Sequence, residues 1–85
     1  MKRTSALKSN YEIFIQFSDT DKVNAYREFS GQLLESYWID HKQECEESND
    51  IDALAYHLLD TYIASDEDYA YEQLIEIILE NKRGK

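Results

Sequence analysis

The segment YEQLIEIILE, residues 71–80, carries two patterns on one predicted helix. One face holds apolar residues at spacings of three and four, namely Tyr71, Leu74, Ile75 and Ile78. The opposite face holds acidic residues spaced by four, Glu72, Glu76 and Glu80. The apolar face predicts a helix packed on a core. The acidic face costs roughly 0.2–0.5 kcal/mol per neighbouring pair, because like charges four residues apart repel each other.

The rest of the chain also favours helices. It has no proline and two glycines, and it lacks the Gly/Asn turn pairs that are typical of β-hairpins. A first helix is expected over about 10–17 with Asn10 as N-cap, and a second from about Asp21 to between Trp38 and Cys45. A third helix is expected after Asn49 or Asp50.

The fourth helix, which contains YEQLIEIILE, is expected to begin at a capping box formed by Ser65 and Asp68. Lys82 and Arg83 suit the negative end of its dipole. Four short helices joined by short loops predict an all-α fold, a compact antiparallel bundle. Residues 1–85 are predicted to form a single domain, with basic tails at 1–9 and 82–85.

The expected core follows the same periodicity in the second and third helices. In the second helix it comprises Val23, Tyr26, Phe29 or Ser30, Leu33, Leu34 and Tyr37. In the third helix it comprises Ile51, Leu54, Leu58 and Tyr62. Gly31 lies inside the second helix, where it is expected to permit a close helix crossing. Ile77 and Leu79 flank the core face of the fourth helix, and a homodimer formed through them is an open alternative.

Charge is distributed unevenly along the chain. The net charge is −9, and the stretch from Gln43 to Asn81 holds twelve Asp/Glu and no Lys or Arg. This sign argues against binding to nucleic acid or to an anionic membrane and favours a basic partner. No stretch approaches the roughly 20 apolar residues of a membrane span, and the start lacks the apolar region of a secretory signal. The sequence therefore predicts a cytoplasmic protein.

Catalytic and metal chemistry find little support in the sequence. There is no Gly-rich phosphate loop and no nucleophile elbow, and none of the eighteen carboxylates is marked for burial. His57 is interpreted as structural, His41 as exposed, and Cys45 as a small, inert, partly buried residue. A lone cysteine excludes an internal disulfide, and two histidines make a metal site improbable. We therefore expect no enzyme activity and no cofactor.

The acidic surface of the last two helices is the candidate functional feature. Its carboxylates could simply form a solvated face that keeps a small protein soluble. However, the charge is of one sign, it covers two successive helices, and it includes tyrosines, which are enriched at binding hot spots. The predicted partner-binding residues are Asp52, Tyr56, Asp60, Tyr62, Asp66, Glu67, Asp68, Tyr69, Glu72, Glu76 and Glu80. Such a face would dock onto a basic cleft and block it.

Three segments resemble a known family. YEIFIQFSDTDKVNAYREF (11–29), LLDTY (58–62) and YEQLIEIILE (71–80) are similar to segments of the helical immunity proteins of the colicin D type, which protect bacteria from their own tRNA-cleaving toxins. The resemblance implies that acidic side chains take the place of tRNA phosphates in a basic toxin active site. The corresponding positions are Asp60, Tyr62 and the carboxylates at 66–68.

Two other functions fit the same residues. One is a phage- or plasmid-encoded inhibitor that mimics nucleic acid and blocks a host defence enzyme. Another is an acidic adaptor module without an inhibitory role. Immunity function is the leading prediction, because it combines the acidic face with the resemblance.

Overall fold

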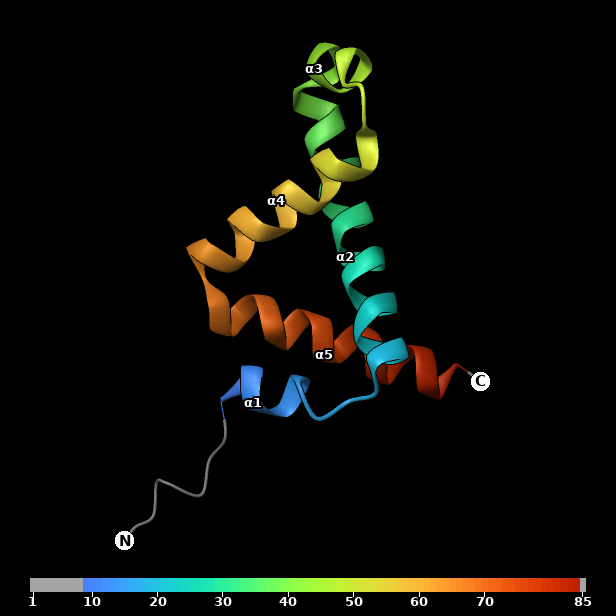
Figure 1. Ribbon diagram of the computed structural model, residues 1–85, viewed down its shortest axis with the longest axis vertical. Coiled ribbons are helices and arrows are strands. Elements are labelled where there is room, and N and C mark those ends of the chain that lie inside the picture. Colours follow the sequence, from blue (N-terminus) through green and yellow to red (C-terminus); the bar gives the residue numbers. More distant parts are fainter. Residues whose placement is uncertain (1–8, 85) are drawn as a thin grey trace, which may run out of the picture.

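The computed structural model describes residues 9–84, which form helices and no strands (Figure 1). The helices are α1 (Asn10–Phe14), α2 (Asp19–Asp40), α3 (Lys42–Glu47), α4 (Ile51–Ser65) and α5 (Glu67–Arg83). The predicted all-α helical bundle is confirmed, with five helices in place of four. The additional helix is α3, which sequence reasoning had treated as an extension of α2.

The two basic tails predicted at 1–9 and 82–85 have different outcomes. Residues 1–8 and 85 lie outside the described residues. Lys82 and Arg83 form the last turn of α5, where they suit the helix dipole as predicted. The Lys82 ammonium also lies 3.0 Å from a carboxylate oxygen of Asp21, which joins the end of α5 to the start of α2.

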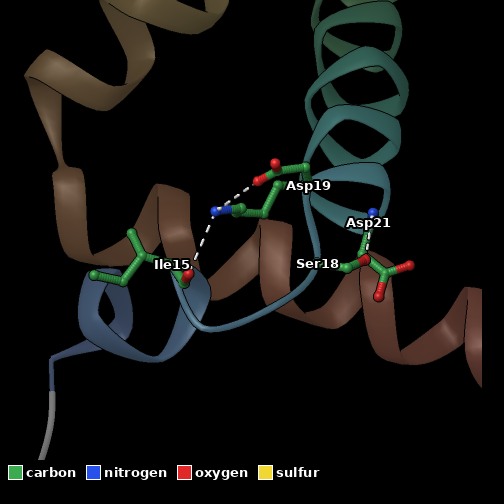
Figure 2. Close-up of polar contacts among 5 residues, drawn as sticks. Ile15, Ser18, Asp19 and Asp21 are labelled. Carbon is green, nitrogen blue, oxygen red and sulfur yellow. Dashed lines mark hydrogen bonds and ion pairs between the residues drawn. The ribbon is translucent and has the colours of Figure 1, made fainter.

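Short polar side chains start four of the helices. Ser9, and not Asn10 as predicted, caps α1 in a capping box with Glu12. The Ser18 hydroxyl caps α2 by accepting a hydrogen bond from the Asp21 N–H at 3.1 Å (Figure 2). Asp50 caps α4, as predicted, by accepting a hydrogen bond from the Ala53 N–H.

The cap of α5 corrects a second prediction. Ser65 belongs to α4, so it forms no capping box with Asp68. Instead the Asp66 carboxylate caps α5 by accepting a hydrogen bond from the Tyr69 N–H. The sequence SDED offers several short polar residues in a row, and the length of α4 decides which of them becomes the cap.

The long helix α2 packs against both α4 and α5, while α1 packs against α5 (Figure 1). Helices α4 and α5 meet at a sharp corner, and α3 packs at the far end of α2. The turn between α1 and α2 is held by Lys22, whose ammonium donates a hydrogen bond to the Ile15 carbonyl at 3.3 Å and lies 3.5 Å from Asp19 (Figure 2). None of the helices in the described part of the chain is both long and apolar enough to cross a membrane.

The core lies where α1, α2, α4 and α5 converge. It consists of seven buried residues: Phe14, Ala25, Phe29, Leu59, Tyr71, Leu74 and Ile78. Aromatic rings tie the helices together, with centroids 5.1 Å apart for Phe14 and Tyr71 and 5.4 Å apart for Phe29 and Tyr62. Such contacts add to the free energy gained by burying the rings. The predicted core face of α5 is confirmed at Tyr71, Leu74 and Ile78, whereas Ile75 is only partly buried.

Three other core predictions need correction. In α4 the residues Ile51, Leu54, Leu58 and Tyr62 are only partly buried, and the buried positions are Ala55 and Leu59. In α2 Val23 is 48% exposed and Ala25, which was not predicted, is buried, whereas the prediction of Phe29 or Ser30 is confirmed, since both are buried. Gly31 does not mark a helix crossing, because a Cβ atom placed there would meet nothing within 4 Å.

Candidate partner-binding site

The predicted partner-binding residues fall into three groups in the structure. Tyr62, Asp66 and Tyr69 line a groove between α2, α4 and the start of α5. Tyr56 and Asp60 line a second groove on the other flank of α4. The remaining six line neither of these two grooves, and all six are exposed: Asp52, Glu67, Asp68, Glu72, Glu76 and Glu80.

The first of these grooves, here called the tyrosine groove, has a volume of about 580 Å³, which is in the range of small-ligand sites. Aromatic rings, leucines and carboxylates line it, together with three hydroxyl side chains. They are Leu33, Ser36, Tyr37, Asp40, His41, Leu58, Thr61, Tyr62, Ser65, Asp66 and Tyr69. The set contains two carboxylates and no Lys or Arg, so the groove favours a cation over an anion.

Asp66 positions the two tyrosines on one side of the tyrosine groove. Its backbone N–H donates a hydrogen bond to the Tyr62 carbonyl at 3.0 Å, which ends α4. Its carboxylate Oδ1 accepts a hydrogen bond from the Tyr69 N–H at 3.3 Å, which starts α5. The Tyr62 and Tyr69 rings stack with centroids 6.2 Å apart and planes inclined by 22°. Asp66 thus both ends α4 and begins α5, and these two hydrogen bonds fix the relative position of the Tyr62 and Tyr69 rings.

The facing wall comes from the C-terminal end of α2 and was not predicted from the sequence. There the Tyr37 and His41 rings stack with centroids 4.2 Å apart and an interplanar angle of 22°. The Tyr37 hydroxyl donates a hydrogen bond to Glu44 of α3 at 2.7 Å, and this bond raises the pKa of Tyr37. Asp40, the last residue of α2, lines the groove beside them.

The raised pKa values of Tyr37 and Tyr62 keep both phenols neutral at physiological pH. Burial raises the pKa of Tyr62, and the neighbouring Tyr69 and Asp66 raise it further. The groove therefore combines aromatic side chains with carboxylates. Aromatic faces are attractive surfaces for cations, and the carboxylates strengthen that attraction.

The second groove holds a single carboxylate. Tyr56 and Asp60 line it together with Val23, Tyr26, Leu59, Ile63 and Tyr71. Its volume is about 490 Å³. Tyr56 is 41% exposed. Because Asp60 is its only charged residue, this groove attracts cations less than the tyrosine groove does.

The acidic residues of α5 differ in what they contact. Asp68 holds α1 on α5, since its backbone carbonyl accepts a hydrogen bond from the Asn10 side chain at 3.0 Å and its carboxylate accepts one from the Asn10 N–H at 3.4 Å. The glutamate row (Glu72, Glu76 and Glu80) is exposed. Between residues 9 and 84 the ion pairs are Lys22–Asp19, Lys42–Glu46 and Lys82–Asp21, and none of them involves this row.

The residues that could act as nucleophiles or metal ligands are dispersed. Cys45 is buried. Its burial raises the pKa of the thiol, and the negative charges of Glu44 and Glu46 raise it further, which keeps the thiol protonated and unreactive. His41 stacks on Tyr37, and His57 is exposed on α4. Residues 9–84 contain no group of three or more His, Cys, Asp or Glu side chains arranged to hold a metal ion. The arrangement is suited to binding through charge and aromatic surface.

Comparison with protein-family models gave no match, and no curated protein and no solved structure matched the chain significantly. The resemblance to immunity proteins of the colicin D type thus depends on the three sequence segments alone. It stays a prediction.

Proposed function

We propose that this chain is a binding protein that neutralises a basic partner by covering its positively charged surface. The partner class that best fits the sequence resemblance is a nuclease toxin, which would make the chain a cytoplasmic immunity protein. Inhibition would follow from occlusion, since a basic cleft that holds nucleic-acid phosphates is closed when carboxylates occupy it. The chain would need no catalytic chemistry of its own.

The observation that supports this proposal most is the uncompensated charge of α4 and α5. All eighteen carboxylates of the chain lie within residues 9–84, which hold only five Lys and Arg residues. The three ion pairs of this part of the chain leave every carboxylate of α4 and α5 without a cationic partner. A basic surface would relieve that repulsion, and this makes complex formation favourable.

The exposed tyrosines support the same proposal. Tyr56 and Tyr69 are 41% and 45% exposed, although a solvated acidic face does not require aromatic residues. Tyrosine combines apolar area with a hydroxyl at low conformational cost and is enriched at binding hot spots. Carboxylates would speed the encounter with a basic protein, and the tyrosines would slow its dissociation.

The test is capture of the partner from the native host on the immobilised chain, with two charge-reversal variants. Glu72→Lys/Glu76→Lys changes the glutamate row. Glu28→Lys/Glu35→Lys makes the same change in net charge at two exposed positions of α2 that line neither groove. We expect a basic protein to bind the wild type and the α2 variant and to be lost from the α5 variant. Equal retention by all three would refute a role for the row.

Inhibition is then measured with the purified partner. If the captured protein is a nuclease, the chain should block cleavage of its substrate in a one-to-one complex, and added salt should slow association steeply. A partner that stays fully active in the complex would refute inhibition and identify the chain as an adaptor. Loss of binding by the α2 variant as well would indicate attraction by net charge alone.

A further inference from the structure

We propose that the tyrosine groove receives an arginine side chain of the basic partner. The inference deepens the proposed function and depends on it only for the existence of a basic partner. It names one occupant, the guanidinium group of arginine, and one place, the space between the Tyr62–Tyr69 pair of the α4–α5 corner and the Tyr37–His41 pair of α2.

Charge complementarity is the first argument. Asp40 and Asp66 line the groove, and no Lys or Arg does. Asp66 uses one carboxylate oxygen to accept the Tyr69 N–H. Its other oxygen and both oxygens of Asp40 accept no hydrogen bond from residues 9–84. Carboxylates with free oxygens beside an apolar wall are suited to charge-assisted hydrogen bonds from a cation.

The aromatic geometry is the second argument. In each pair the ring planes are inclined by 22°, so a flat group that stacks on one ring lies nearly parallel to both. Tyr69 is 45% exposed, so its ring is accessible to a partner. A cation placed over such a face is attracted by the ring quadrupole, and a planar cation can also stack on it.

Arginine fits this combination better than lysine. Its guanidinium is planar, stacks on aromatic rings and donates several hydrogen bonds in one plane, whereas an ammonium is a compact and strongly hydrated charge. Leu33 and Leu58 line the same groove and offer apolar surface to the methylene stem of the side chain. The groove thus matches the apolar stem, the flat head and the charge of arginine.

The experiment uses the full chain and three short acetylated peptides that contain one arginine, one lysine or one citrulline between glycines. Citrulline has the shape of arginine without its charge. Two-dimensional NMR of the tyrosine rings follows each titration. We expect the arginine peptide to shift the resonances of Tyr37, Tyr62 and Tyr69 saturably, the lysine peptide to bind several times more weakly, and the citrulline peptide not to bind.

Matched variants assign the site. Asp66→Asn removes the charge and keeps the helix cap, because Asn caps helices as well as Asp does. Asp60→Asn makes the same change in the second groove, on the other flank of α4. Asp66→Asn should weaken binding of the arginine peptide severalfold, and Asp60→Asn should leave it unchanged. Tyr69→Leu, with Tyr56→Leu as its control, tests the aromatic face at two similarly exposed positions.

Several results would overturn the inference. Equal binding of the citrulline peptide would show apolar packing in place of cation recognition. Equal weakening by Asp60→Asn and Asp66→Asn would show attraction by net charge alone, and shifts confined to Tyr26 and Tyr56 would place the site in the second groove. Failure of the proposed function is a separate result, since it is measured with the glutamate-row variant and the native partner.

Discussion

Replacing Glu76 by lysine should make the free protein more stable while weakening its binding to the partner. Glu76 is exposed at the middle of the glutamate row, between Glu72 and Glu80, and it has no ion pair within residues 9–84. Each like-charge pair four residues apart costs roughly 0.2–0.5 kcal/mol, and each opposite pair gains a similar amount. Glu76→Lys converts two repulsive pairs into two attractive ones.

The expected gain in the free energy of unfolding is about 1 kcal/mol. The sum over two pairs is roughly 0.8–2 kcal/mol, and the lower part of that range applies because one new pair has lysine N-terminal to glutamate, the weaker orientation. For a domain of this size, about 1 kcal/mol corresponds to an increase in Tm of roughly 4–8 °C. The neutral variant Glu76→Gln removes the repulsion without adding attraction, so about half of the gain is expected.

Urea unfolding monitored by far-UV circular dichroism at about 0.01 M salt measures this gain. At about 1 M salt the Debye length falls to roughly 3 Å, so the difference between Glu76→Lys and wild type should nearly vanish. A variant no more stable than wild type would refute the reasoning, because it would mean that Glu76 already has a compensating contact. A gain that persists in high salt would show that its origin is not electrostatic.

Three further predictions concern the core and the buried groups. Leu74 is fully buried, so Leu74→Ala should lower the free energy of unfolding, measured in urea, by about 2–5 kcal/mol. A loss under about 1 kcal/mol would contradict its central place in the core. Burial raises the pKa of Tyr71, so the free energy of unfolding should fall as pH rises above about 10. In urea unfolding at alkaline pH, Tyr71→Phe should reduce this fall. The same pH dependence in wild type and variant would contradict the role of Tyr71. Cys45 should react with a thiol reagent slowly in the native protein and rapidly in urea, and equal rates would argue against its burial.

The number and order of helices were largely predictable because amphipathic periodicity and polar caps are local signals. The errors arise where the choice depends on neighbouring helices. In α4 the run Leu58–Leu59 offers two adjacent apolar residues, and the position of α4 against the other helices decides that Leu59 is the buried one. Ala25 and Ala70 are fully buried, although small residues give a weak hydropathy signal. They were missed because a close contact between helices is a tertiary property.

The candidate site was predictable only in part for the same reason. Tyr62, Asp66 and Tyr69 are close in sequence, and all three were among the predicted partner-binding residues. Tyr37 and Asp40 lie more than twenty residues before them, and no local pattern connects the two segments. Only the packing of α2 on α4 brings them together. A tyrosine three residues from a carboxylate, Tyr37 with Asp40 and Tyr69 with Asp66, is the signal that could have suggested a shared groove.

The junction at Asp66 has a consequence for changes in chain length. Because Asp66 both ends α4 and caps α5, no loop residues separate the two helices to absorb an insertion. One residue added there would turn α5 by about 100° about its axis, which would carry Leu74 and Ile78 away from the core and bring acidic side chains toward it. Insertions and deletions at this corner should therefore disrupt the fold. At Ser48 and Asn49, which lie between α3 and α4, they should be tolerated. A library of single-residue insertions would measure this difference directly.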